Sequence, residues 1–123
     1  MSIALDVLIV GAGPYGLSIA AHLRSHGISS GIFGPPMEVW REHMPKGMLL
    51  KSDGFASNLS DPGTSFPLKR FCEMRGIHYH DTDVPVAIET FIDYALAFQE
   101  KLVPHLDTRR VARIDRTADG YSV

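Results

Sequence analysis

The sequence predicts an α/β fold in which a parallel β-sheet is flanked by helices. The first observation is a continuous apolar run at residues 5–10 that ends at a glycine, as is typical of a strand buried on both faces. The second is the helical spacing of apolar residues at 17–23, with Gly27 as the stop. A second strand at 30–33 completes a β-α-β unit of about thirty residues, the length of one right-handed crossover.

Length and composition limit the number of domains and the classes of protein that the chain can represent. The 123 residues are one domain's length, and we expect a single domain, 1–123, that is incomplete at its C-terminus. With 45% hydrophobic residues, 21% charged residues and a net charge of −2, the chain resembles neither a disordered protein nor a nucleic-acid binder. The apolar N-terminal stretch carries Asp6 and several glycines, which argues against a signal peptide or a membrane span. Cys72 is the only cysteine, so we expect a cytoplasmic protein without disulfides.

The remaining elements follow from periodicity and from glycine and proline positions. We expect a short helix at 37–43, a loop over most of 44–66, a helix at 67–75 capped by Ser65 and stopped by Gly76, and a helix at 86–102. A third parallel strand is expected at 108–114, giving the strand order 3-2-1, with a turn at 119–120.

The segment D-V-L-I-V-G-A-G-P-Y-G, residues 6–16, indicates the chemistry. Gly11 permits a tight turn, Gly13 removes a side chain that would block a pyrophosphate, and Gly16 allows the helix to pack against the strand. Phosphate charge would meet the unpaired N–H groups of the helix N-terminus. A strand before the turn and a helix after it favour a Rossmann-like dinucleotide-binding fold over an ordinary glycine loop.

The end of the second strand departs from this pattern. Such folds usually place an Asp or Glu there to hold the adenosine ribose, but this chain has Gly34. Glu38 is a helical turn too far along the chain for a simple substitution, and neither Arg24 nor Arg41 is obviously placed to bind a 2′-phosphate. The motif alone therefore leaves the choice of dinucleotide open.

A family resemblance narrows that choice. The segments G-A-G-P-Y-G-L-S-I-A-A-H-L, I-F-G, W-R-E-H-M-P-K-G-M-L-L-K-S and V-P-V-A-I-E-T-F-I-D-Y resemble the N-terminal FAD-binding region of flavin-containing and N-hydroxylating monooxygenases, over nearly the whole chain. The resemblance implies FAD as cofactor and NADPH as co-substrate of the complete enzyme. It also implies that the glycine turn contacts the pyrophosphate of the cofactor. By the same resemblance, Trp40, Lys51 and Ser52 would lie near the flavin end of the cofactor. The expected cofactor-binding residues are Gly11, Ala12, Gly13, Pro14, Tyr15, Gly16, Gly34, Trp40, Lys51 and Ser52.

We therefore expect the FAD-binding portion of a flavin-dependent oxidoreductase, monooxygenase-like in its chemistry. The family's second glycine-rich turn, for NADPH, does not occur in these residues, so we expect no complete catalytic cycle and name no catalytic residue. The alternatives are a non-catalytic NAD(P)- or FAD-binding module and a truncated, inactive fragment. The small-molecule substrate and the oligomeric state stay open.

Other candidate residues have simpler interpretations. The segment 78–81, H-Y-H-D, resembles half of a metal site but lacks further ligands in register, so no metal is expected. Cys72 falls on the apolar face of its helix and is expected to be a core thiol. Trp40 and Tyr15 could stack on a ligand or fill a core, and Lys51 could contact the cofactor or remain a solvated charge.

Overall fold

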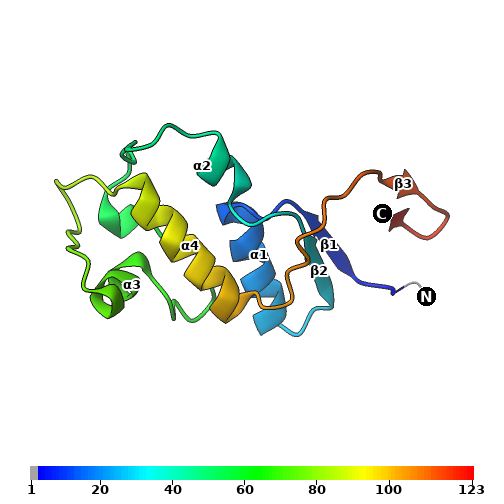
Figure 1. Cartoon of the computed structure of the whole chain (residues 1–123). Coiled ribbons are helices and arrows are strands. Elements are labelled where there is room, and N and C mark those ends of the chain that lie inside the picture. The colour runs from blue at the N-terminus through cyan, green and yellow to red at the C-terminus, as the bar shows by residue number, and fades with distance from the viewer. Residues whose placement is uncertain (1–2) are drawn as a thin grey trace.

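The computed structural model describes residues 3–123. The elements, in chain order, are β1 (Val7–Val10), α1 (Pro14–Ser25), β2 (Ser30–Phe33), α2 (Glu38–Glu42), the 3₁₀ turn η1 (Gly54–Ala56), α3 (Leu68–Arg75), α4 (Ile88–Leu102), β3 (Asp115–Arg116) and β4 (Tyr121–Ser122). Figure 1 shows α1 between the β1–β2 pair and α4, α3 on the far side of α4, and the β3 segment projecting away from the helices. The predicted α/β class with flanking helices is confirmed.

The predicted β-α-β unit forms as expected. Strands β1 and β2 are parallel neighbours, with Val7 opposite Ser30 and Val10 opposite Phe33. Helix α1 begins at Pro14, whose missing N–H costs nothing in the first turn of a helix. Its buried residues are Leu17, Ala20 and Ala21. Among the described residues, β1 pairs with β2 alone.

The prediction of a third parallel strand at 108–114 was wrong. A single parallel bridge joins Phe33 to Asp107, where the Gly34 N–H donates to the Asp107 carbonyl at 2.9 Å. Beyond this bridge, residues 108–114 would have to pair with Pro35 and Pro36, which carry no N–H to continue the ladder. The chain therefore leaves the sheet after one bridge, and β3 pairs antiparallel with β4 across the predicted turn at 119–120.

The core lies mainly between α4 and the elements around it. The buried residues of α4 recur at helical spacing, as predicted, and are Ile88, Phe91, Tyr94, Ala95 and Phe98. Tyr94 occupies the centre: its hydroxyl donates to the Phe66 carbonyl at 2.8 Å and accepts from the Leu59 N–H at 3.0 Å. The Phe66 and Phe71 rings pack against the Tyr94 ring with centroids 5.8 Å away. One side chain thus links α4 to the long segment before α3.

The segment 44–66 is mostly irregular, as predicted, but it is tied to the core by specific hydrogen bonds. The Leu50 N–H donates to the Val86 carbonyl at 2.8 Å, and the Ile88 N–H donates to the Met48 carbonyl at 2.9 Å. These bonds hold the segment against the start of α4.

The predicted cap of α3 was wrong in detail. Ser65 hydrogen-bonds Asp61, with its hydroxyl donating to Oδ2 at 2.9 Å, and Pro67 is the residue that precedes the helix. The Leu68 N–H at the helix start instead donates to Asn58 Oδ1 at 2.8 Å. Because this acceptor comes from ten residues earlier, local spacing gave no sign of it. Gly76 ends the helix with φ 66°, as predicted.

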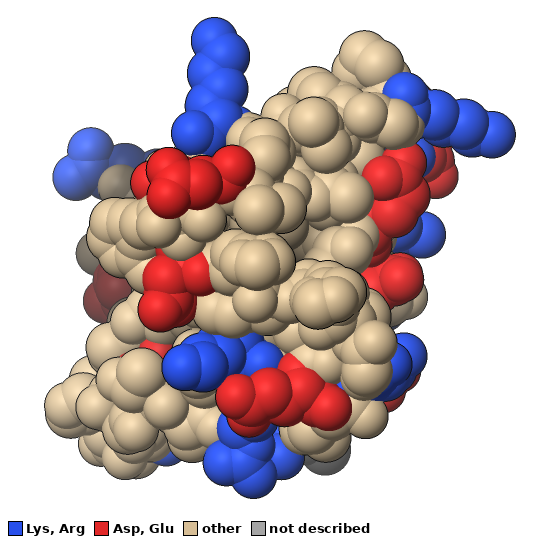
Figure 2. Space-filling model, turned by 90° about the vertical axis from the view of Figure 1, so that its left-hand side faces the viewer, with Lys and Arg blue, Asp and Glu red and all other residues tan. Residues whose placement is uncertain are grey.

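The surface carries charges of both signs. On the face shown in Figure 2, Lys and Arg side chains lie among Asp and Glu side chains, with uncharged areas between them. No helix in residues 3–123 is long and apolar enough to cross a membrane.

Removing the Tyr94 hydroxyl tests the role of this side chain in the core. Tyr94→Phe leaves a buried N–H and a buried carbonyl without their partner, and we expect a loss of about 1–3 kcal/mol in the free energy of unfolding. Urea denaturation measures the loss. Tyr121→Phe, at a residue that is 74% exposed, is the matched control and should change stability by less than about 0.5 kcal/mol. Equal losses in the free energy of unfolding for the two substitutions would contradict the role of the Tyr94 hydroxyl in the core.

Candidate functional site

The glycine turn sits where the carboxyl end of β1 meets the first turn of α1. The Gly11 N–H donates to the Phe33 carbonyl at 2.9 Å, which ties the turn to β2. A Cβ on Gly16 would overlap the Gly11 carbonyl oxygen, so α1 can approach the strand this closely only with glycine there. A Cβ on Gly13, by contrast, would meet nothing within 4 Å. The open space beside Gly13 exposes bare backbone to a ligand.

A cavity of about 430 Å³ opens beside this turn, and we call it the first cavity. It lies at the carboxyl ends of both parallel strands, where ligands bind in open α/β sheets. Its walls come from the glycine turn, the end of β2, the start of α2 and a distant segment. The lining residues are Val10, Gly11, Ala12, Gly13, Phe33, Gly34, Pro35, Met37, Glu38, Val39, Trp40, Arg110 and Val111.

Met37 fixes α2 against the turn. It is fully buried, and its N–H donates to the Ala12 carbonyl at 2.9 Å. Its backbone is left-handed, with φ 56°, an uncommon conformation for a residue other than glycine. This bend directs the chain back toward the glycine turn and places the next residue, Glu38, at the first cavity.

A charged pair closes one side of the first cavity. Arg110 Nη1 and Nη2 donate to the two carboxylate oxygens of Glu38, each at 2.6 Å. This bidentate contact holds the pKa of the Glu38 carboxyl below its usual value. Although Glu38 lies a helical turn too far along the chain for a simple substitution, the bend at Met37 brings it and Gly34 to one cavity.

A second cavity, of about 390 Å³, lies on the other side of Trp40. Trp40 lines both cavities, and its ring packs against Phe91 with centroids 5.1 Å apart. The second cavity is partly polar, because Ser52 and Ser57 lie on its wall with their hydroxyl oxygens 2.7 Å apart. Its lining residues are Pro14, Tyr15, Ser18, Trp40, Leu50, Ser52, Ala56, Ser57, Asn58, Ser60 and Phe91.

Most of the predicted cofactor-binding residues line one of the two cavities. Gly11, Ala12, Gly13 and Gly34 line the first, Pro14, Tyr15 and Ser52 line the second, and Trp40 lines both. Gly16 lies beneath the turn as a packing residue, and Lys51 is exposed and lines neither cavity.

Sequence reasoning missed Arg110, Val111, Ser57 and Asn58 as cavity residues. No local motif marks the first two, because their segment comes back to the turn from far along the chain. For Ser57 and Asn58, the available signal was the polar pair that they form in the segment S-N-L-S, residues 57–60.

The cysteine and histidine candidates show no chemistry of their own. Cys72 is buried, and burial raises the pKa of its thiol, as a core position requires. The rings of His78 and His80 stack with centroids 5.8 Å apart, and their segment is irregular.

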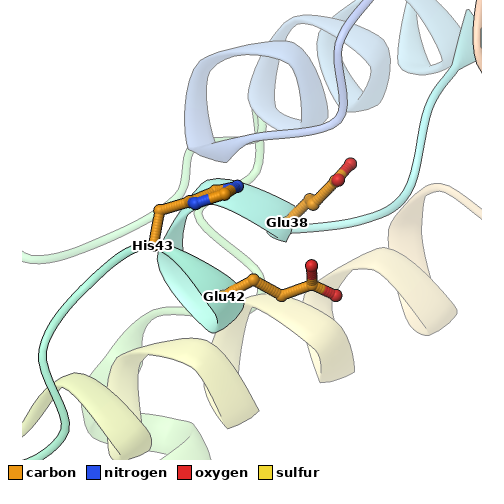
Figure 3. A group of neighbouring side chains, drawn as sticks. All are labelled: Glu38, Glu42 and His43. Carbon is orange, nitrogen blue, oxygen red and sulfur yellow. The ribbon is translucent and has the colours of Figure 1, made fainter.

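One further group has the composition of a metal site. Figure 3 shows Glu38, Glu42 and His43, whose ligand atoms all lie within 4.8 Å of one another. The Glu38 carboxylate already pairs with Arg110, however, and the other two side chains are exposed. Exposed acidic groups of this kind are common without a metal.

Comparisons with known proteins bear directly on this site. A family model described as FAD binding domain matches residues 4–35, the segment that holds β1, the glycine turn, α1 and β2. No curated protein matches this chain by sequence.

Solved structures share the fold of this chain. A flavin-containing monooxygenase from Stenotrophomonas maltophilia matches with a TM-score of 0.73 and 21% identity, over 95% of this chain and 32% of its own. A bacillithiol disulfide reductase from Staphylococcus aureus matches with a TM-score of 0.65 and 17% identity, over 91% and 30%. OTEMO, crystallised with FAD and NADP, matches with a TM-score of 0.67 and 17% identity, over 98% and 22%. The chain thus spans about a third or less of the length of these proteins.

Substitution of Gly16 tests the close packing under the turn. Gly16→Ala must displace either α1 or the Gly11 carbonyl, and we expect a loss of about 1–3 kcal/mol in the free energy of unfolding. Gly13→Ala, three residues away, has open space and serves as the control. Urea denaturation should show Gly16→Ala to be the more damaging by at least about 1 kcal/mol. The reverse order would contradict the packing described here.

Proposed function

We propose that this chain is the FAD-binding portion of a flavin-dependent oxidoreductase, with the adenosine and pyrophosphate held at the first cavity and the flavin directed toward the second. The observation that carries the proposal is the glycine turn, which combines bare backbone at Gly13, a helix N-terminus and an adjoining cavity. The match of residues 4–35 to an FAD-binding domain supports it.

Pyrophosphate binding follows from the local backbone. The first N–H groups of α1 have no partner within the helix, and aligned peptide dipoles leave partial positive charge at this end. A phosphate placed beside Gly13 would accept from these donors, as anions do at helix N-termini. No side chain at Gly11 or Gly13 obstructs its approach.

The two cavities give a path for the rest of an extended cofactor. Trp40 lies between them and offers an apolar ring to a ligand that passes from one to the other. Tyr15, which is 86% exposed, lies at the second cavity and presents a ring for stacking. The hydroxyl of Ser52 on the same wall is a hydrogen-bonding group for the polar edge of a flavin. We do not assign Lys51 a contact in this arrangement.

The chemistry of such an enzyme belongs to the flavin, which accepts hydride and, in monooxygenases, reacts with oxygen. The residues of this chain would bind the cofactor, orient it and keep water from it. The structure of OTEMO contains FAD and NADP, and we propose monooxygenase-like chemistry with NADPH for the complete enzyme. The chain spans 32% of the monooxygenase from Stenotrophomonas maltophilia, so we propose substrate binding and turnover for the complete enzyme only. The free thiol of Cys72 agrees with a cytoplasmic location.

Cofactor titration tests the proposal. We expect the purified chain to bind FAD, followed by isothermal calorimetry and flavin absorbance, and Gly13→Val to weaken binding at least about a hundredfold because the side chain occupies the phosphate approach. Gly63→Val, in a turn that lines neither cavity, is the matched control and should bind as the wild type does.

The same titration separates the alternatives. Binding of NAD(P) in preference to FAD would favour a non-catalytic nucleotide module, and a chain that binds neither would favour an inactive fragment. Unchanged FAD affinity in Gly13→Val would refute the site.

Fluorescence of Trp40 tests where the flavin lies. Trp40 is the only tryptophan of the chain, so its emission reports on the boundary of the two cavities alone. We expect FAD to quench this emission strongly, because a flavin ring near Trp40 accepts its excitation energy. ADP, which carries no flavin, should quench it far less at equal occupancy. Equal quenching by the two ligands would place the flavin away from the second cavity.

A further inference from the structure

The first cavity contains a single acidic residue. Among its lining residues, Glu38 carries the only carboxylate and Arg110 the only positive charge. Gly34, which ends β2 at the position where dinucleotide folds usually place an acid, lines the same cavity. Within this chain, the carboxylate placed to meet a ribose in this cavity is therefore that of Glu38.

The backbone at Gly34 explains why no acid stands there. Its φ is 132°, a conformation that residues with a side chain rarely adopt, and its N–H is engaged by the Asp107 carbonyl. Glycine is thus required at the end of β2 in this chain, and the ribose must be recognised from another element.

The orientation of the charged pair suits this task. The Glu38 side chain is 20% exposed, whereas that of Arg110 is 68% exposed, so the carboxylate lies on the inner side of the pair. Each carboxylate oxygen accepts one hydrogen bond from Arg110 and retains a second acceptor site. A glutamate carboxyl is ionised at neutral pH even at its ordinary pKa, and Arg110 lowers the pKa of Glu38 further. It is therefore a fixed acceptor for hydroxyl groups.

We propose that the Glu38 carboxylate, positioned by Arg110, accepts hydrogen bonds from the adenosine ribose hydroxyls of the bound cofactor, in place of the acid that the end of β2 lacks. This inference rests on the proposed FAD site. The Glu38 carboxylate would also set cofactor specificity, because its negative charge repels a 2′-phosphate and favours a dinucleotide with a free ribose diol.

Ribose-modified nucleotides test the proposal without any need for turnover. The probes are ADP, 2′-deoxy-ADP, 3′-deoxy-ADP and adenosine 2′,5′-bisphosphate, each titrated by calorimetry. We expect the wild type to bind ADP about tenfold more tightly than at least one deoxy probe. In Glu38→Ala this ratio should fall to near one. Glu42→Ala, an exposed acid of the same helix that does not line the cavity, should keep the wild-type ratio.

The bisphosphate distinguishes recognition from a merely structural role. Loss of the Glu38 carboxylate leaves the Arg110 guanidinium unpaired at the cavity, so Glu38→Ala should bind adenosine 2′,5′-bisphosphate at least about tenfold more tightly relative to ADP than the wild type does. Damage to the fold alone would weaken all four probes together. Because each comparison is a ratio of affinities within one protein, it does not depend on the fraction that is folded.

The outcomes separate this inference from the function on which it rests. If the wild type and Glu38→Ala both bind FAD and show the same ribose ratios, the role of Glu38 is wrong and the FAD site stands. If the wild type binds neither FAD nor ADP, both are wrong. Preference of the wild type for the bisphosphate over ADP would also overturn the assignment of Glu38.

Discussion

The close approach of α1 to the end of β1 is the contact on which the rest of this structure depends. No side chain fits between Gly16 and the Gly11 carbonyl, so the helix N-terminus and the strand end meet at the shortest distance the backbone allows. The turn between them leaves the Ala12 carbonyl free to accept from Met37, which anchors α2. Glu38 and Trp40 then take their places at the cavities. One steric constraint therefore positions both the glycine turn and the side chains around it.

Elements determined by local pattern could be predicted from the sequence, and those determined by distant partners could not. The strand, turn and helix at 5–25 follow from apolar spacing and three glycines. The segment 108–114 was expected to be a strand, yet Pro35 and Pro36 deprive it of a partner, since strand formation depends on the neighbouring strand. Likewise the pairing of Glu38 with Arg110, across 72 positions, leaves no trace in local spacing.

The site is organised for binding and orientation. Its polar groups are backbone N–H donors at the turn, one ion pair at the first cavity and hydroxyls on the wall of the second cavity. None of these groups needs to transfer a proton for a flavin to work, because the cofactor carries the redox chemistry. Under the proposed function, the absence of an acid at Gly34 would change how the nucleotide is held and would leave the redox chemistry of the flavin unaffected.

The hydrogen bonds of Tyr94 have a consequence for the energetics of association. By holding Leu59 and Phe66, they fix the segment that carries Ser57, Asn58 and Ser60. A wall held in place by the core before a ligand arrives has little conformational entropy left to lose when the ligand binds. Binding to such a preorganised surface depends on the contacts made and needs no ordering of a loop.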